Sequence, residues 1–436
     1  MRIRLKNVAI ITDADVELGG VTVIAGPNRS GKSTIGRVLM TYGTLLRRMD
    51  ELVRNRKLAL FLERLGEVLG LSELLRYRLR RVGVHDFQAD ELLTPAFWED
   101  ASRVTALFKN LSQGMSPARE KTMFDALASL DSREIQSNLQ AILEQDEGPM
   151  VLEIIEDNFH AAFAGQINSL RHPETEACIS LGGESSQEPW ELVFASQGLH
   201  RASGPTSVPF PRIIYLEPMH LMDLISNAFS YRSLAFDRYD AGECSWMEIL
   251  KPATERNEGI SAEEKERTSQ MVFKLKEILG GELAVKDGRL LFREQTDGHE
   301  VSWIELMNLA SGVKSLSIIL QAIANHSLAK GTIFVIDEPE ANLHPEWQIK
   351  FARILVHLWA DLGVRVVVAT HSPYFLKSLE VCSSESNALD DLKCYFMRQD
   401  SDGLQGTVAL DVTGQLNKVY KTFFEPLNGL MAGAEE

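Results

Sequence analysis

The sequence is poor in cysteine and has no long apolar run. Its 436 residues include four cysteines, none with CxxC spacing: Cys178, Cys244, Cys382 and Cys394. This pattern supports neither a zinc site nor a disulfide framework, so we expect reduced thiols. No apolar stretch approaches the roughly 18 residues of a membrane span, and Thr12 and Asp13 interrupt the first apolar stretch too early for a signal-peptide core. We therefore expect a cytoplasmic protein without a membrane partner.

Positive charge is also scarce overall. The formal net charge is −16 at pH 7, which argues against a protein that coats nucleic acid by bulk electrostatics. One stretch is different, because residues 44–81 contain more basic than acidic side chains. The basic residues there are Arg47, Arg48, Arg54, Arg56, Lys57, Arg64, Arg76, Arg78, Arg80 and Arg81. A solvated helical face is the plainer interpretation of this basic stretch, and a patch that contacts nucleic acid is the alternative.

Apolar periodicity divides the chain into four parts. The length exceeds what a single core usually fills, so several structural units are expected. We predict an N-terminal lobe in residues 1–43, a helical insertion with associated strands in 44–204, a second lobe in 205–376, and a C-terminal cap in 377–436. Strands are predicted at residues 2–10, 15–18, 21–25, 177–181, 190–195, 212–216, 333–336 and 366–369. Helices are predicted over most of 44–143, at 155–167, at 262–279 and near 416–427, with hairpin turns at 287–288 and 297–298.

The strongest chemical signal is a glycine-rich loop between a predicted strand and a predicted helix. Residues 26–33 match G-x-x-x-x-G-K-[ST], the phosphate loop. Such a loop aims consecutive backbone N–H groups at a β-phosphate, and the following helix N-terminus adds partial positive charge. The predicted ATP-binding residues here are Gly26, Pro27, Asn28, Arg29, Ser30, Gly31, Lys32, Ser33 and Thr34.

Individual side chains of the phosphate loop have separate roles in this interpretation. Lys32 is expected to reach the β- and γ-phosphates, and the Ser33 hydroxyl to bind Mg²⁺. ATP and Mg²⁺ are therefore the predicted cofactors. Arg29 stands where a left-handed backbone conformation would cost a non-glycine residue about 1 kcal/mol, if the loop requires that conformation.

Two further polar groups follow buried strands. Asp337 and Glu338 come directly after the apolar run 333–336, and His371 follows the run 366–369 after Thr370. Ligands of open α/β sheets bind at the carboxyl ends of parallel strands. We expect Asp337 to hold Mg²⁺, Glu338 to accept a proton from the attacking water, and His371 to contact the γ-phosphate and that water.

The order of these motifs resembles the ABC-ATPase heads of the OLD, RecF and SMC-like group. Between the phosphate loop and the Asp-Glu strand lies Asn-Leu-Ala-Ser-Gly-Val-Lys at 308–314, and Glu-Ala-Asn-Leu-His-Pro follows at 340–345. The resemblance covers about residues 1–40 and 205–376. It implies an α/β P-loop NTPase fold of ABC-ATPase type, with a mixed β N-terminal lobe, a helical insertion and a parallel-sheet core lobe.

The resemblance also implies a homodimer that closes head to tail around two nucleotides, with a higher oligomer left open. Ser311 and Gly312 would close over the γ-phosphate held by the other protomer. Ala341, Asn342, Leu343 and His344 would form a loop that crosses the dimer interface, here called the seam loop. The signature departs from Leu-Ser-Gly-Gly, because Ala310 replaces a serine and Ser311 a glycine. We find no glutamine loop in the sequence.

Finer features resemble the stand-alone ATPase subunits of bacterial anti-phage systems such as Septu. They are Tyr-Leu-Glu-Pro at 215–218 and Phe-Ala-Gly-Gln-Ile-Asn at 163–168. We expect no Toprim nuclease domain, because Asp400 and Asp402 have suitable spacing but lie in a turn-like polar stretch. The resulting hypothesis is an ATPase subunit whose nucleotide-driven dimer regulates a separately encoded effector, a nuclease in our interpretation, in anti-phage defence.

Two alternatives remain. A DNA repair or recombination ATPase would bind DNA through the basic stretch, and charge reversal at Arg76, Arg78, Arg80 and Arg81 would then abolish salt-sensitive binding. A self-contained RNA-cutting toxin regulated by its ABC head would cut RNA with no partner present. The histidines of the insertion are His85, His160 and His172, and none forms a convincing pair with a carboxylate at helical spacing that would support this toxin.

Overall fold

The computed structural model describes most of the chain as two compact units. The described residues are 1–71, 73, 76, 89–112, 121, 124–125, 132–169, 171–182, 189–196, 198–204, 211–217, 261–286, 289–294, 303–305, 308–399 and 406–433. Met1–Arg47 and Asn158–Glu436 form the first unit, and Arg48–Asp157 forms the second. The helices α1 (Lys32–Val68) and α8 (Glu147–Phe163) contribute to both units.

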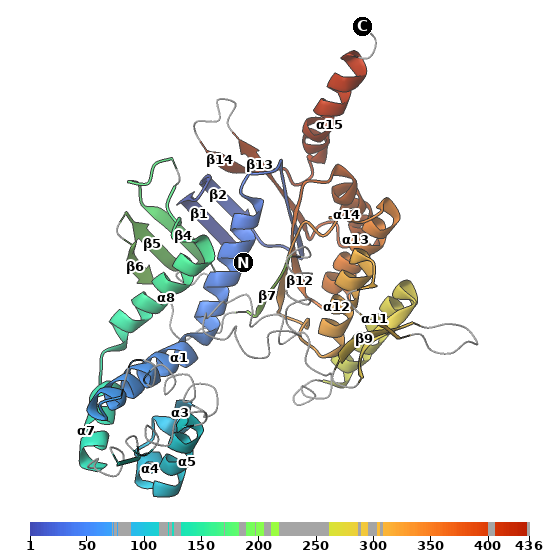
Figure 1. The fold of residues 1–436 in the computed structure, drawn as a ribbon. Coiled ribbons are helices and arrows are strands. Elements are labelled where there is room, and N and C mark those ends of the chain that lie inside the picture. The colour runs from blue at the N-terminus through green and yellow to red at the C-terminus, as the bar shows by residue number, and fades with distance from the viewer. Residues whose placement is uncertain are drawn as a thin grey trace. The chain divides into compact units, whose positions relative to one another are not determined.

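Among the described residues, an eleven-stranded sheet organises the first unit (Figure 1). Its strands, in spatial order, are β6 (Gly198–Ser203), β5 (Trp190–Ala195), β4 (Ala177–Gly182), β1 (Arg2–Val8), β2 (Ile11–Glu17), β14 (Thr407–Asp411), β13 (Leu392–Gln399), β3 (Val21–Ala25), β12 (Arg365–Thr370), β11 (Ile333–Asp337) and β7 (Ile213–Leu216). The five strands from β6 to β2 pair antiparallel, and the five from β13 to β7 pair parallel. The predicted fold class, with a mixed N-terminal lobe and a parallel core, is confirmed.

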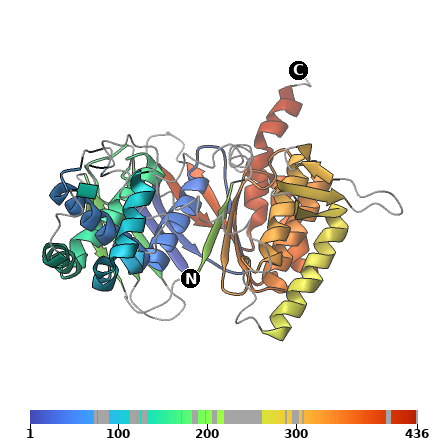
Figure 2. The ribbon, with the colours of Figure 1, turned by 60° about the horizontal axis from the view of Figure 1, so that its bottom comes forward.

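Helices cover both faces of the parallel strands. On one side lie α12 (Ser311–Ala324), α13 (Pro345–Ala360) and α14 (Pro373–Glu385), the orange layer that Figure 2 shows from a second direction. Beside them lie α11 (Ala262–Leu279) and a small sheet of β8 (Gly281–Lys286), β9 (Arg289–Glu294) and β10 (Trp303–Glu305). The first turns of α1 lie on the other side, where a Cβ at Gly36 would come within 3.0 Å of Tyr215 and Val335 side-chain atoms.

The parallel strands are apolar because both of their faces are covered. Every residue of β3 and β11 is buried, and so are five of the six residues of β12. The core on the helical side includes Phe334 and Val368 from the strands and Leu355 from α13. Strands buried on both faces read as continuous apolar runs, which is why 21–25, 333–336 and 366–369 were recognisable in the sequence.

Local capping signals fix where the helices begin and end. The Ser261 hydroxyl accepts a hydrogen bond from Glu264 N, and the Glu264 carboxylate accepts one from Ser261 N, so α11 begins with a capping box. It ends at Gly280, whose φ of +67° is the left-handed conformation that glycine adopts at helix ends. The Ser372 hydroxyl caps α14 by accepting a hydrogen bond from Phe375 N, and Pro373 occupies its first turn.

The second unit is helical, as the apolar periodicity predicted. Its described elements are the later turns of α1, α3 (Ala89–Leu92), α4 (Pro95–Glu99), α5 (Ala101–Ser112), α7 (Ser132–Leu143) and the start of α8. They enclose a core of their own that includes Phe61, Trp98 and Phe108. The rings of Phe61 and Trp98 meet edge to face with centroids 5.1 Å apart. The Trp98 indole donates to the Leu92 carbonyl at 2.7 Å, so this buried polar atom is satisfied.

The structure divides the chain differently from the four predicted parts. The strands that we grouped with the helical insertion, β4 and β5, pair within the main sheet, together with β6, which we did not predict. The predicted C-terminal cap is also integral to that sheet, because β13 pairs with β3 and β14 pairs with β2. The last helix, α15 (Leu416–Gly433), extends the predicted closing helix. These groupings depend on pairing between strands that are far apart in the sequence, and local sequence patterns do not predict such pairing.

One smaller correction concerns the start of a strand. The second strand begins at Ile11 and not at Asp15, so it pairs with most of the first strand. The turns predicted at 287–288 and 297–298 lie outside the described residues. Within the described part of the chain, no helix combines the length and the apolar character needed to cross a bilayer.

One prediction concerns the close contact at the start of β3. A Cβ at Gly20 would lie 2.3 Å from Cε2 and Nε1 of Trp359, whose indole donates to Asp391 at 2.9 Å. We expect Gly20→Ala to lower the free energy of unfolding by about 1–3 kcal/mol through overpacking. The matched control is Gly182→Ala, where the nearest atom is 3.8 Å away and the change should be within about 0.5 kcal/mol. Chemical denaturation followed by circular dichroism measures both, and equal effects would contradict the expectation.

Candidate functional site

The carboxyl ends of three neighbouring parallel strands meet at one edge of the main sheet. In the pairing register Thr370 of β12 lies opposite Ala25 of β3, and Asp337 of β11 lies opposite Ala369. The Gly26 N–H donates to the Thr370 carbonyl at 3.3 Å, which continues the pairing into the loop. The phosphate loop, the Asp-Glu pair and the histidine segment therefore leave the sheet at the same level.

The phosphate loop lines an open cavity of about 470 Å³. The residues that line it are Ala9, Ile10, Asn28, Arg29, Ser30, Gly31, Lys32, Ser33, Thr34 and Glu338. The backbone of the loop is left-handed at two positions, Arg29 with φ of +63° and Gly31 with φ of +86°. The left-handed conformation considered for Arg29 is therefore present. Its steric cost is the kind of backbone strain that functional loops retain.

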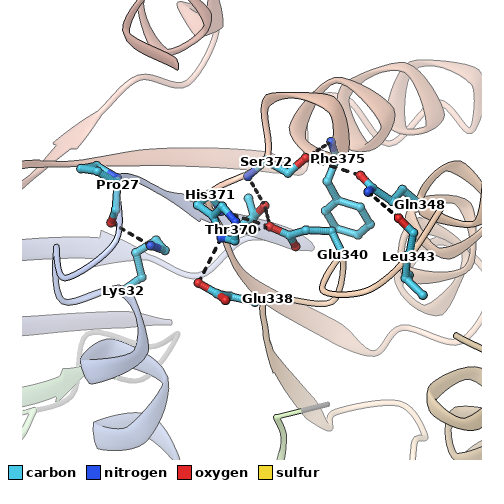
Figure 3. A network of polar contacts seen from close by, with 10 residues as sticks. All are labelled: Pro27, Lys32, Glu338, Glu340, Leu343, Gln348, Thr370, His371, Ser372 and Phe375. Atoms are coloured by element: carbon cyan, nitrogen blue, oxygen red, sulfur yellow. Dashed lines mark hydrogen bonds and ion pairs between the residues drawn. The ribbon is translucent and has the colours of Figure 1, made fainter. Parts of the chain in front are cut away.

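Lys32 brings a buried positive charge to this cavity. The residue is 4% exposed, and its Nζ donates to the Pro27 carbonyl at 2.9 Å (Figure 3). Burial lowers the pKa of Lys32, and the negative charges of Glu338, Asp337 and Glu340 oppose that shift. An ammonium held in this way is suited to an anionic ligand, which would restore the electrostatic stabilisation lost through burial.

Asp337 ends β11 almost fully buried, at 6% exposure. The Tyr215 hydroxyl donates to its Oδ2 at 3.3 Å, while its Oδ1 is buried without a hydrogen-bond partner among the described residues. Burial raises the pKa of Asp337, and the Ser33 side chain beside it opposes this shift. A carboxylate oxygen without a partner, beside a hydroxyl, is a donor set that suits Mg²⁺. The two residues predicted to hold the metal are thus neighbours, and they fit it.

Glu338 and His371 meet at the mouth of the site. Their Oε1 and Nδ1 atoms lie 3.1 Å apart, and both side chains remain partly exposed (Figure 3). Glu338 has a left-handed backbone, with φ of +47°, and its N–H donates to the Ala369 carbonyl at 2.8 Å. This turn directs the carboxylate to the cavity that the phosphate loop lines, so the pair predicted to activate water is assembled.

The predicted signature and seam loop contact each other, and neither is among the residues that line this cavity. Ser311 begins α12 after the N-cap Ala310. A Cβ at Gly312 would lie 2.6 Å from Cδ2 of Leu343, so the helix start contacts the seam loop. Within the seam loop Asn342 is left-handed, with φ of +60°, and His344 caps α13.

Residues 208–377 match the family model described as "AAA domain, putative AbiEii toxin, Type IV TA system". The matched segment contains β7, α12, β11 and β12 and therefore the Asp-Glu pair and the histidine. Its strands pair in parallel with β3, which leads into the phosphate loop. The fold is that of an ABC-type ATPase head.

Three solved structures of SMC heads are similar to this chain. The "SMC head domain from Thermotoga maritima" is 10% identical, with a TM-score of 0.39, and the match covers 94% of this chain and 98% of that one. The SmcHead "bound to the C-winged helix domain of ScpA" is 13% identical, with a TM-score of 0.41 and coverages of 96% and 98%. A Smc head with an extended coiled coil, bound to a ScpA domain derived from Pyrococcus furiosus, is 11% identical, with a TM-score of 0.38 and coverages of 97% and 98%.

Sequence reasoning missed a buried carboxylate at this site. Glu340 is 5% exposed, and its Oε1 accepts hydrogen bonds from the Thr370 hydroxyl and, at 3.1 Å, from His371 N (Figure 3). The same oxygen lies 3.7 Å from His371 Nδ1. Glu340 thus fixes the turn that presents His371. The available signal was a third acidic residue two positions after the Asp-Glu pair, and Tyr215 was similarly visible as a polar side chain in an apolar strand.

A second chain of hydrogen bonds links the histidine segment to the seam loop. The Ser372 hydroxyl donates to Gln348 Oε1 at 3.4 Å, and Gln348 Nε2 donates to the Leu343 carbonyl at 3.1 Å (Figure 3). The starts of α13 and α14 are joined in this way. A displacement of the seam loop would therefore act on the residue next to His371.

The second unit contains most of the described residues of the predicted basic stretch. Four of its basic side chains lie within ion-pair distance of acidic ones: Arg48 with Glu51, Arg56 with Glu153, Lys57 with Glu147, and Arg76 with Glu67. Arg78, Arg80 and Arg81 lie outside the described residues, as do His85, Asp400 and Asp402. His172 of the first unit does have a carboxylate neighbour, Glu174 at 3.4 Å, but both are exposed.

A prediction follows from the burial of Glu340. Folding raises the pKa of this carboxyl, chiefly because burial disfavours its charge. Its ionised form therefore destabilises the folded state at neutral pH, and this effect is lost as the pH falls through the raised pKa. Glu340→Gln removes the charge and keeps an acceptor oxygen. We expect the melting temperature of the Glu340→Gln protein, relative to the unaltered protein, to be highest near pH 8 and to fall towards pH 5.

Glu340→Ala is the matched control for this measurement. It leaves the Thr370 hydroxyl and the His371 N–H without their acceptor, so we expect a loss of about 1–3 kcal/mol at either pH. Thermal unfolding of the three proteins at several pH values makes the comparison. If the melting temperature of the Glu340→Gln protein instead rose relative to that of the unaltered protein as the pH fell, the pKa of Glu340 would not be raised by folding.

Proposed function

We propose that this ATPase head binds ATP with Mg²⁺ and hydrolyses the γ-phosphate bond. The observation that carries the proposal is one cavity lined by the phosphate loop and by Glu338. Lys32 and Ser33 lie in its wall, and Asp337 lies beside Ser33. A buried ammonium, a helix N-terminus and a carboxylate beside a hydroxyl together suit a nucleotide triphosphate and its metal.

The chemistry assigns a role to each side chain. Lys32 and the backbone N–H groups of residues 28–33 bind the β- and γ-phosphate oxygens. Ser33 and Asp337 would hold Mg²⁺, which supplies positive charge against the phosphates. Glu338 takes a proton from water as the water oxygen attacks the γ-phosphorus and the bond to the β-phosphate oxygen breaks, giving ADP and phosphate. His371, at 3.1 Å from Glu338, orients that carboxylate and contacts the γ-phosphate.

We further propose that two copies complete each other's sites head to tail. Ser311 and Gly312 begin a helix outside the lining of their own cavity, and a helix N-terminus attracts phosphate. In a head-to-tail dimer this end would face the γ-phosphate of the other copy. The contact of Gly312 with Leu343 would then couple the signature to the seam loop of the same protomer.

The proposed biological role is regulation of a separate effector in anti-phage defence, with a nuclease as the favoured effector. Two observations support it: the sequence resemblance to stand-alone defence ATPase subunits, and a matched family whose description includes a putative toxin of a type IV toxin–antitoxin system. The same description favours the self-contained toxin as a second candidate. RNA cleavage by the purified protein alone would support that candidate.

The DNA-repair alternative receives less support from the described residues. Arg48, Arg56, Lys57 and Arg76 already have acidic neighbours, so binding DNA phosphates through them would require exchanging those partners. Exposed ion pairs are weak and can exchange. The DNA-repair function therefore remains one possible outcome when the Glu338→Gln protein is purified from its native host, as described below.

Two substitutions test the catalytic assignment. We expect Lys32→Ala to weaken ATP binding at least about 100-fold, because the buried ammonium that faces the phosphates is lost. We expect Glu338→Gln to retain ATP binding and to lower the hydrolysis rate by roughly 100- to 10,000-fold, the usual contribution of a general base. Titration calorimetry and phosphate release provide the measurements. Lys421→Ala, at an exposed position of α15, is the control and should change neither.

Full hydrolysis by the Glu338→Gln protein would remove Glu338 as the base. Undiminished binding by the Lys32→Ala protein would remove the cavity as the ATP site.

The Glu338→Gln protein should remain in the ATP-bound state because it hydrolyses ATP only slowly. This trapped state also tests the proposed dimer and the proposed effector. Glu338→Gln protein with Mg²⁺ and ATP should sediment as a dimer, and Lys32→Ala protein under the same conditions as a monomer. The Glu338→Gln protein, purified from its native host with Mg²⁺ and ATP, should retain its partner longest. A co-purifying protein with nuclease residues supports the regulated effector. Nucleic acid without a protein partner would instead favour the DNA-repair function.

A further inference from the structure

The end of β13 contacts the phosphate loop from the far end of the sequence. Gln399 Nε2 donates to the Arg29 carbonyl at 2.8 Å, across 370 positions of the chain. The strand pairs in parallel with β3, so its last residue lies where β3 gives way to the loop. None of the roles assigned above uses this side chain.

The contact falls on a residue of the loop whose backbone is left-handed. Arg29 is the one non-glycine residue in 26–33 with a positive φ, +63°. Side chains disfavour this conformation, so the surrounding structure has to hold it. A hydrogen bond to the Arg29 carbonyl does this directly, because it fixes the plane of the peptide that joins Arg29 to Ser30.

That peptide plane also controls a donor of the phosphate site. In a trans peptide, the carbonyl and the N–H of the next residue point in opposite directions. If Gln399 holds the Arg29 carbonyl outward, the Ser30 N–H points inward, to the concave side of the loop. The same hydrogen bond keeps a carbonyl dipole from turning its negative end towards bound phosphate.

The surroundings of Ser30 indicate that the loop is built against β13. Ser30 is fully buried, and its Oγ has no hydrogen-bond partner among the described residues. A Cβ at Gly26 would lie 2.9 Å from both Ser30 Oγ and Met397 Cβ. Met397 precedes Gln399 by two residues and therefore lies on the same face of β13. The phosphate loop thus packs against β13, and Gln399 is the last residue of that strand.

We propose that Gln399 is a positioning residue for the phosphate site. It acts through the Arg29 carbonyl, holding the loop in the conformation that presents the Ser30 N–H to the β-phosphate. This inference rests on the proposed nucleotide binding. It adds a requirement from the C-terminal segment that the phosphate-loop motif does not contain.

The test is the affinity of Gln399→Leu protein for ADP and for inorganic pyrophosphate. We expect both dissociation constants to rise roughly 3- to 10-fold, the range for loss of one hydrogen bond. Pyrophosphate lacks adenosine, so an equal loss for the two ligands assigns the effect to the phosphates. The melting temperature without ligand should remain within about 1 °C. Gln415→Leu, an exposed glutamine of the same segment, is the matched control.

A second variant covers a loss of stability. If Gln399→Leu melts earlier, the uncharged and similarly shaped Gln399→Met, which also lacks the N–H donor, should show the same loss of pyrophosphate binding. Unchanged ADP and pyrophosphate binding by these variants would overturn the role of Gln399. In that case normal binding by the unaltered protein and loss with Lys32→Ala would leave the proposed function intact. An unaltered protein that binds no nucleotide would overturn both.

Discussion

Parallel pairing of β3, β12, β11 and β7 is the constraint on which the rest of the molecule depends. It aligns Ala25, Thr370 and Asp337 at one edge, so segments more than 300 residues apart end at the same level. Parallel strands require crossover connections, and the helices that make them cover both faces of the sheet. The apolar core and the polar edge therefore have one cause. No single segment could form this edge without the register of the others.

The loops that leave this edge hold backbone strain at positions that carry chemistry. Arg29, Glu338 and Asn342 all have positive φ values, between +47° and +63°, although none is glycine. Each belongs to a different motif: the phosphate loop, the Asp-Glu pair and the seam loop. Such conformations persist only where neighbouring contacts determine them. The Gln399 hydrogen bond and the Ala369 carbonyl are two of those contacts. The stability of the sheet thus maintains geometry that the loops would not adopt alone.

Sequence patterns predicted the parts of the site that local chemistry determines. The runs around residues 21–25, 333–336 and 366–369 are recognisable because strands buried on both faces are continuously apolar, and the phosphate loop has its own spacing. Glu340, Tyr215 and Gln399 were not assigned roles, because their partners lie 31, 122 and 370 positions away. The placement of β13 and β14 inside the sheet was missed for the same reason. Long-range register, which no local window contains, separates the predicted features from the missed ones.

The position of β13 and β14 has a consequence for how the protein is made. Within the described sheet, β2 is joined to β3 through β14 and β13, although β2 and β3 are successive in the chain. A ribosome releases the phosphate loop early, but the strand that supports it comes some 360 residues later. At a synthesis rate of about 5–20 residues per second, β13 is synthesised tens of seconds after the phosphate loop. Nascent chains that stop before residue 392 therefore contain the whole phosphate-loop motif and lack the strand beside it, so an unfinished copy cannot assemble the site described for the finished one.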